Sequence, residues 1–150
     1  MTIQRAYLPD ITELAVLFDQ YRQFYLHTSD INLAKAFLTE RIAANESVIF
    51  VAKNEDHKMV GFVQLYPSFS SISAKRSWIL NDLFVIEAVR GQGVGKALLD
   101  KAKAMAIETA AVSLTLETHH TNTESQKLYL SLGYQLEEQF KSYYLKLTDN

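Results

Sequence analysis

The alternation of apolar and polar positions predicts a short strand over residues 3–7, followed by two helices. Apolar residues recur at helical spacing from Ile11 toward Tyr25, and a second run with the same spacing follows Asp30. Asp10 and Asp30 stand where helix N-caps are expected. Longer apolar runs then predict three strands with polar turns between them: strands at 48–53, 59–66 and 78–85, and turns at 54–57 and 67–73.

The pattern changes again in the second half of the chain. An apolar stripe predicts a helix from Gly93 to about Thr109, and residues 112–117 alternate as a strand. A second helix begins near Asn122, and Gly133 can end it in a left-handed conformation. Two further runs, 134–136 and 142–147, predict a closing antiparallel pair.

Three of the five glycines lie between the strand at 78–85 and the helix that follows, within residues 91–95. Small residues before a helix allow close approach of a ligand, and the first N–H groups of the helix carry partial positive charge, so this loop predicts a phosphate cradle. A Walker A loop does not fit, because the spacing is too short and Ala97 follows Lys96 where a hydroxyl residue would hold magnesium. A dinucleotide fingerprint does not fit either, because its third glycine is missing.

The arrangement Arg90-x-x-Gly93-x-Gly95 resembles the pyrophosphate-binding motif of the GCN5-related N-acetyltransferases, the GNAT superfamily. The segment 122–134 is similar to the second cofactor segment of that family, with an Asn, a small residue, then Tyr, Gly and an aromatic residue. Ser125 stands where the family more often has Ala. The resemblance implies an α/β (α+β) fold with a mixed, mostly antiparallel seven-stranded sheet, splayed at its centre and flanked by four helices.

The resemblance implies acetyl-CoA as the cofactor. The loop and the helix after it would hold the pyrophosphate, the edge of the preceding strand would pair with the amides of the pantetheine arm, and Asn122 would both cap its helix and contact the arm. The expected cofactor-binding residues are Leu83, Phe84, Val85, Arg90, Gly91, Gln92, Gly93, Val94, Gly95, Lys96, Asn122 and Tyr129. The side chain of Arg90 can alternatively buttress the loop while backbone groups bind.

Acetyl transfer to an amine requires a base for the ammonium, whose pKa is about 10, and an acid for the leaving thiolate. By resemblance Tyr129 is the acid, although a helix tyrosine can also serve packing alone. Glu117, at the end of its strand, is the first candidate for the base, and Asp82 and Glu87 are the alternatives. His119-His120 is interpreted as a plain loop, and no metal site is expected.

The acceptor is expected over the splay, with Tyr25, Tyr66 and Asp82 as substrate residues and Tyr21 and Tyr143 as further lining. Aromatic rings suit an amine through cation–π contact. The run Leu80-Asn81-Asp82-Leu83 is similar to the branch with small yeast histone and D-amino-acid acetyltransferases. Polyamines, amino acids and protein lysines all stay open as acceptors.

Composition adds expectations about the number of domains, the type of acyl transfer and the partners. At 150 residues and 48% hydrophobic content we expect one domain spanning 1–150. The absence of cysteine excludes disulfides and a cysteine acyl-enzyme, so direct transfer is expected. A net charge of −2 without a basic cluster argues against nucleic-acid and membrane partners, and we expect a cytoplasmic enzyme. A homodimer is expected by resemblance. The alternatives are an acetyl-CoA-binding sensor without turnover and a site for another nucleotide.

Overall fold

The computed structural model describes residues 1–149, and the chain divides into two compact units, Met1–Glu117 and Thr118–Asn150. Each unit is considered by itself below. The expectation of a single domain stays a prediction.

The first unit contains all the strands and three of the four helices of the described chain. It begins with β1 (Thr2–Arg5), the single 3₁₀ turn η1 (Leu8–Asp10), α1 (Ile11–Phe24) and α2 (Ile31–Ala43). There follow β2 (Val48–Lys53), β3 (Met59–Ser70), β4 (Lys75–Val85), the 3₁₀ turn η2 (Glu87–Val89), α3 (Val94–Glu108) and β5 (Leu114–Thr115). This order is the order expected from the sequence up to this point.

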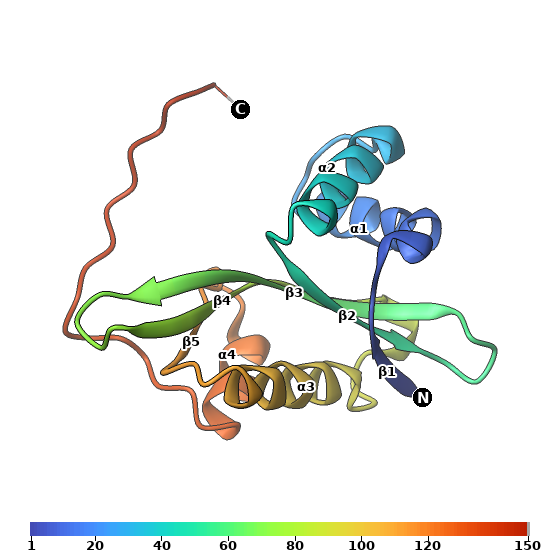
Figure 1. Ribbon diagram of the computed structural model, residues 1–150. Helices are drawn as coiled ribbons and strands as arrows, with labels where there is room; N and C mark the ends of the chain where they lie inside the picture. Colours follow the sequence, from blue (N-terminus) through green and yellow to red (C-terminus); the bar gives the residue numbers. More distant parts are fainter. Residues whose placement is uncertain (150) are drawn as a thin grey trace. The chain divides into compact units, whose positions relative to one another are not determined.

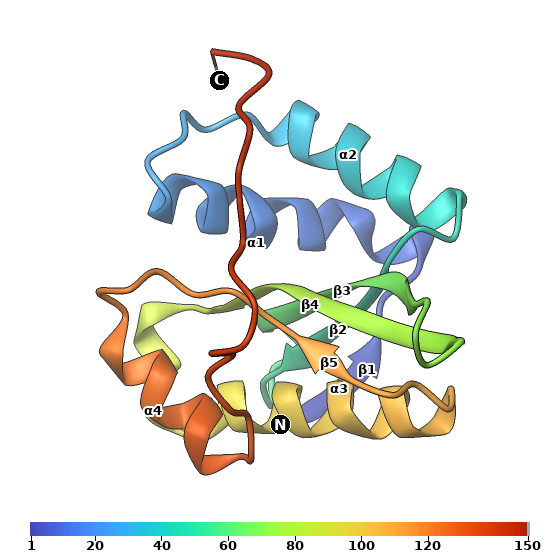
Figure 2. The ribbon, with the colours of Figure 1, turned by 90° about the vertical axis from the view of Figure 1, so that its left-hand side faces the viewer.

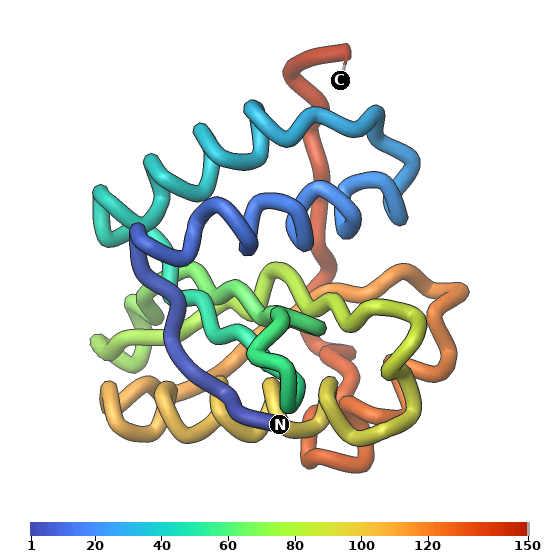
Figure 3. Tube along the Cα trace, turned by 90° about the vertical axis from the view of Figure 1, so that its right-hand side faces the viewer, coloured from blue at the N-terminus to red at the C-terminus, as the bar shows by residue number. Residues whose placement is uncertain are grey.

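The strands form one sheet in the order β1-β2-β3-β4-β5. The first three pairings are antiparallel, whereas β4 and β5 are parallel, so the sheet is mixed and mostly antiparallel as expected. Helices α1 and α2 cover one face and α3 covers the other (Figure 1). Figures 2 and 3 show from opposite sides that the loop joining α1 to α2 and the loop entering α3 lie at the same end of these layers.

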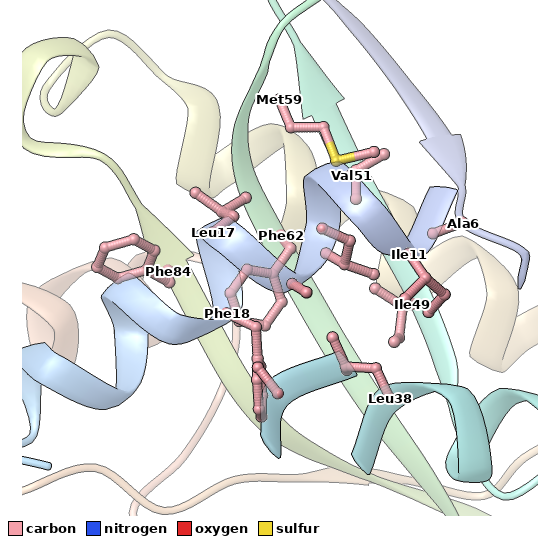
Figure 4. Packing of buried hydrophobic residues seen from close by; sticks show 13 residues of the cluster. Ala6, Ile11, Leu17, Phe18, Leu38, Ile49, Val51, Met59, Phe62 and Phe84 are labelled. Carbon is pink, nitrogen blue, oxygen red and sulfur yellow. The ribbon is translucent and has the colours of Figure 1, made fainter. Parts of the chain in front are cut away.

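The main core lies between the sheet and the two N-terminal helices. Leu17 and Phe18 of α1 approach Phe62 of β3, with Leu38 of α2 completing the layer (Figure 4). Phe62 and Leu38 are completely buried, and full burial of one such side chain stabilises the fold by about 1.5–3 kcal/mol. The apolar stripes in the sequence therefore pack as their spacing predicts.

Several details of the first unit differ from expectation, and the predicted strand at 112–117 is reduced to β5, Leu114–Thr115. The predicted turn at 67–73 is wrong at its start, because β3 continues through Pro67 to Ser70 and pairs with an equally prolonged β4. Proline is tolerated there because the pairing of β2 with β3 ends at Leu65, so no neighbour on that side needs its missing N–H. Asp10 gives no side-chain cap to α1; its carboxylate accepts a hydrogen bond from the N–H of Tyr7 at 2.8 Å.

The second unit contains one helix, α4 (Thr123–Ser131), which Asn122 caps by accepting from the N–H of Ser125 at 3.4 Å. Gly133 follows with a φ of 94°, as the sequence predicts. The expected strands at 134–136 and 142–147 are wrong: among the described residues the sheet has five strands, not seven. The apolar side chains that suggested the last strand are exposed, and unburied β-forming side chains gain little from strand pairing; they are Tyr143, Tyr144, Leu145 and Leu147.

Candidate active site

The glycine loop between β4 and α3 has the backbone that a phosphate cradle requires. Gly91 and Gly93 have φ values of 77° and 84°, in the left-handed region that other residues avoid. Gly93 is the N-cap of α3 and no side chain caps this helix, so its first N–H groups face outward from a positive helix end. A Cβ placed on either glycine would meet nothing within 4 Å, which leaves room above the loop. These features fit the pyrophosphate of coenzyme A.

The charged side chains of the loop are used within the protein. Lys96 pairs with Asp100 of α3, with Nζ and Oδ2 2.7 Å apart. Arg90 donates from Nε to the carbonyl of Val85 at 2.9 Å, and its guanidinium lies over the rings of Phe24 and Phe84 at 5.6 and 5.8 Å. Arg90 therefore ties the loop to the end of β4 and to α1, as in the buttressing alternative.

The edge of β4 that precedes the loop is open within the first unit. The parallel pairing of β4 with β5 comprises only Trp78 with Leu114 and Ile79 with Thr115. From Leu80 to Val85 the described residues of this unit provide no partner strand on that side. Leu83, Phe84 and Val85 thus have the open edge that the expected pairing with a pantetheine arm requires.

A β-bulge at Asn81 decides which face of the sheet carries Asp82. In the antiparallel register, Leu80 pairs with Leu65 and Asp82 with Gln64, so Asn81 is the extra residue. Directly paired residues share a face, and successive β3 residues alternate. Asp82 therefore lies on the face of Phe62 and Phe84, under α1 and α2, whereas a regular strand would put it beside Leu80 on the α3 face.

This face carries a cavity of about 390 Å³, within the range of about 300–1,000 Å³ for small-molecule sites. Its lining comes from α1 and the loop after it, from Phe37 of α2, and from Tyr66, Asn81 and Asp82 of β3 and β4. Rings dominate the lining, and two of its groups carry opposite charge, the Asp82 carboxylate and the Arg22 guanidinium. The lining residues are Phe18, Tyr21, Arg22, Tyr25, His27, Phe37, Tyr66, Asn81 and Asp82.

Asp82 is the buried acid of this cavity, with 5% of its surface exposed. Its Oδ2 accepts from Gln64 Nε2 at 2.6 Å and its Oδ1 accepts from Asn81 Nδ2 at 3.1 Å, and Tyr21 also donates to the carboxylate. Burial raises the Asp82 pKa above its usual range, although these donors oppose the shift. A carboxylate with a raised pKa is a stronger base than an exposed one, which suits it to accepting a proton.

The two tyrosines beside Asp82 stay protonated near neutral pH. Burial, followed by the Asp82 charge, raises the pKa of Tyr66 to about 12 and raises that of Tyr21 further still. Tyr21 also packs edge-on against Phe62 and Phe84, with ring centroids 5.6 and 5.9 Å apart. Both tyrosines therefore present hydroxyl donors and aromatic faces to the cavity.

Asp19 holds the loop that carries Tyr25 and His27. Its carboxylate accepts from Ser29 Oγ and from the N–H of Asp30, each at 2.7 Å, and from Gln23 Nε2 at 3.0 Å. Burial alone would raise the Asp19 pKa, but these hydrogen bonds and the nearby Arg22 charge together lower it. An ionised Asp19 thus fixes one wall of the cavity.

The structure brings together some of the residues expected from the sequence and separates others. Tyr25, Tyr66 and Asp82, with Tyr21, line one cavity. Glu117 is exposed after β5, and Glu87 lies exposed in η2; neither lines this cavity. Arg22 and His27 also line the cavity and were not expected there; their only signal in the sequence is their position in and just after the helix that supplies Tyr21 and Tyr25.

The remaining expected residues belong to the second unit. Tyr129 lies on α4, half-buried, with its ring 5.8 Å from that of Tyr134. Burial raises the pKa of Tyr134, whose hydroxyl has no partner among the described residues. His119 Nδ1 lies 2.7 Å from Thr121 Oγ1, so this side chain makes a local contact within the loop before α4.

A glycine-cradled helix N-terminus, an open strand edge and a polar cavity on one α/β sheet define a coenzyme-A-dependent acyltransferase class. The comparisons with known proteins identify the family: the acetyltransferase (GNAT) family model matches residues 12–134. The chain is 45% identical over 147 residues to an uncharacterized N-acetyltransferase of Bacillus subtilis, YhfO, and the alignment covers 98% of each protein. It is 42% identical over 94 residues to a probable acetyltransferase of Haemophilus influenzae, covering 63% of this chain and 64% of that one.

A solved structure gives the same result for the fold. The crystal structure of a probable acetyltransferase matches with a TM-score of 0.96 at 44% identity, covering 100% of both chains. The chain therefore belongs to the GNAT family and is an N-acetyltransferase, which confirms the family resemblance. GNAT acetyltransferases use acetyl-CoA as the acyl donor. Among the described residues, no helix is long and apolar enough to cross a membrane.

Proposed function

We propose that the enzyme transfers an acetyl group directly from acetyl-CoA to the primary amine of a small molecule. The observation that carries this proposal is the buried Asp82 in an aromatic cavity on the sheet that also carries the glycine loop. The cavity volume of about 390 Å³ lies near the small end of the range for small-molecule sites, which favours a compact acceptor over a peptide lysine.

The proposed binding of acetyl-CoA uses backbone groups more than side chains. The N–H groups from Gly91 to Lys96 hold the pyrophosphate, with Arg90 fixing the loop. The open edge at Leu83, Phe84 and Val85 pairs with the amides of the arm. Asn122 and Tyr129 are part of the proposed cofactor site because residues 122–134 resemble the second cofactor segment of the family. Bound acetyl-CoA supplies the activated acetyl group.

The proposed chemistry needs one proton acceptor and one donor. The amine nitrogen forms a bond to the acetyl carbon, the carbon–sulfur bond breaks, and the ammonium proton passes to a carboxylate. Asp82 is favoured over Glu117 for this step because it is buried in the cavity with a raised pKa, whereas Glu117 is exposed. Tyr129 is the proposed donor to the leaving thiolate.

Release of free thiol from acetyl-CoA tests this proposal against a panel of polyamines, amino acids of both hands, aminoglycosides and a lysine-rich peptide. Transfer to a small amine is expected, and Tyr129→Phe should lower turnover while the affinity for coenzyme A stays the same. Binding of coenzyme A without transfer to any amine would contradict the enzyme proposal and favour a sensor. Failure to bind coenzyme A would contradict the proposed cofactor site.

We also propose that the protein is a homodimer in which the C-terminal segment contacts a second copy. Residues 140–147 expose five large apolar side chains, with exposed fractions from 77% for Phe140 to 91% for Tyr143, and such exposed apolar patches commonly mark protein contacts. Light scattering should give the mass of a dimer, and the double variant Tyr143→Glu/Leu145→Glu should give that of a monomer. A monomeric native protein would contradict this proposal.

A further inference from the structure

The cavity contains a cationic group that acid–base chemistry with an amine does not require. Arg22, on α1, lines the cavity, and its Nη1 is buried without a hydrogen-bond partner among the described residues. An unpaired buried donor costs about 1–3 kcal/mol, and more when the group is charged. Arg22 is close enough to Asp19 for their charges to interact, but no ion pair within 4.0 Å joins them in the described part of the chain.

Asp82 of β4 adds an acceptor to the lining of the same cavity. Asp82 receives three hydrogen bonds from protein groups, and a carboxylate has about four acceptor sites, so one site is left. Oε1 of Gln64 is buried without a partner among the described residues, and it belongs to the amide that donates to Asp82. Of these two residues only Asp82 lines the cavity, so the remaining acceptor site of its carboxylate, on β4, is the one that a ligand can use.

The two charged groups do not neutralise each other directly. No ion pair within 4.0 Å joins Arg22 to Asp82 in the described part of the chain, although both line the same cavity. The same lining includes the rings of Phe18, Tyr21 and Tyr66. The cavity lining thus combines a cation, a carboxylate and aromatic rings, with the two charges not paired to each other.

We propose that this cavity binds a zwitterionic acceptor, an α-amino acid or a close relative, with its carboxylate on Arg22 and its ammonium on Asp82. This inference rests on the proposed acetyl transfer and names its substrate class. A guanidinium binds a carboxylate by charge-assisted hydrogen bonds, often in bidentate geometry, and His27 lies beside it as a further polar group. Aromatic faces next to Asp82 add cation–π attraction for the ammonium.

The charge arrangement discriminates against the other acceptor classes. A polyamine would bring a second cation toward Arg22, where like charges repel. A peptide lysine would bring an amine but no carboxylate, so Nη1 would stay buried and unpaired. A free amino acid satisfies both charged groups of the cavity at once.

Matched pairs of acceptors test the inference. Each amino acid that is acetylated, in either hand, is compared with its decarboxylated amine and with its amide, for example phenylalanine with phenethylamine and phenylalaninamide. We expect kcat/KM for the amino acid to exceed that for its partners at least about 10-fold, since a lost charge-assisted hydrogen bond costs about 1.5–3 kcal/mol. Equal values with and without the carboxylate would overturn the inference while acetyl transfer itself stood.

The variant Arg22→Met removes the charge and keeps much of the side-chain length. It should raise KM for the amino acid about 10-fold or more and leave KM for the decarboxylated amine little changed. Lys103→Met, which removes an exposed cation from α3 on the other side of the sheet, is the matched control and should change neither. A parallel rise in both KM values for Arg22→Met would show a merely structural role and overturn the inference.

Calorimetric binding of the same amino acids provides a readout without turnover. Native protein saturated with coenzyme A should bind the amino acid, and Arg22→Met should bind it at least about 10-fold more weakly. Binding with undiminished affinity in Arg22→Met would overturn the inference. Amino-acid binding without any thiol release would support it and contradict only the proposed transfer.

Discussion

The two faces of the paired strands β3 and β4 differ beside the bulge at Asn81. On the α3 face, Val63, Leu65, Trp78 and Leu80 are buried, with exposed fractions of 4% or less. On the face under α1 and α2, the paired residues Gln64 and Asp82 are buried just as deeply although both are polar. Burial of polar groups is costly unless they are paired, so a face that keeps an acid and an amide without filling all their bonds is better suited to a ligand than to stability.

The difference arises from one residue. Without the bulge at Asn81, Asp82 would follow Leu80 onto the apolar α3 face. The bulge therefore places an acid on the face that also packs Phe62 and Phe84 under α1, where the cavity adjoins the core. An asparagine introduced on each face should therefore have different effects on activity and on stability.

Asp82→Asn should produce the largest effect, a fall in kcat/KM of about 10²-fold or more, because general-base catalysis and the anchor for the ammonium are both lost. The amide keeps one acceptor oxygen and loses the hydrogen bonds to the other, whereas burying an amide costs less than burying a carboxylate; because these two effects oppose each other, the melting temperature should change little. Thiol release measures the loss of activity, and thermal unfolding measures the melting temperature. Full activity in the folded variant would remove Asp82 from the mechanism, and Glu117→Gln, which should stay active, is the matched comparison.

Leu80→Asn places the same amide on the α3 face, two residues away. We expect the free energy of unfolding to fall by about 3–5 kcal/mol, through lost apolar burial and an unpaired amide. Activity per folded molecule should be retained at a temperature where the variant is folded. Urea unfolding gives the first quantity, and a small loss of stability with a large loss of turnover would contradict the assignment of the two faces.

Asp19→Asn should cost about 1.5–3 kcal/mol at neutral pH, since hydrogen bonds to a charged acceptor are lost in a site only 3% exposed. The Asp19 pKa is lowered in the folded state, so its contribution is present above the unfolded value of about 3.9 and is lost as the pH falls through the folded value. The stabilities of the two proteins should therefore converge in acid. A constant difference across the pH range would show that ionisation of Asp19 is not the cause.

Gly93→Ala should have the smallest effect on stability, about 1–2 kcal/mol, from forcing a side chain into a φ of 84°. It should also weaken coenzyme A binding, measured by calorimetry, because the cradle distorts. Asn45→Ala is the matched control: it places alanine at a φ of 59° between α2 and β2 and should cost stability without changing coenzyme A affinity. If Gly93→Ala bound coenzyme A with unchanged affinity, the loop would not be part of the cofactor site.

Periodicity predicted the first unit well because each of its stripes packs on a sheet face or a helix. The ranges of β2 and α3 and the Asp30 cap follow from local rules, and the Asp30 carboxylate accepts a hydrogen bond from the N–H of Leu33 at 3.0 Å, as a cap should. Gly93 was expected as the first residue of α3 and is instead its left-handed N-cap. The predictions of strands at 134–136 and 142–147 are wrong because an alternating pattern shows which side chains could share a face. It does not show whether a partner strand is present.

The candidate site was only partly predictable for a different reason. Asp82 and Tyr66 could be singled out from residue type and resemblance, but the bulge that puts them on one face depends on register between two strands. Arg22 could not be singled out, because its unpaired nitrogen results from what α1 packs against, which helical spacing does not specify.

Chemical-shift mapping on isotopically labelled protein tests the central claim most directly: the polar face of β3 and β4 holds the acceptor beside the coenzyme A site. Saturating coenzyme A should shift amide signals from Leu83 to Lys96, and a free amino acid added next should shift those of Tyr21, Arg22, Tyr66 and Asp82. Amino-acid shifts confined to α3 or to the residues after Glu117, with the cavity signals unmoved, would contradict it.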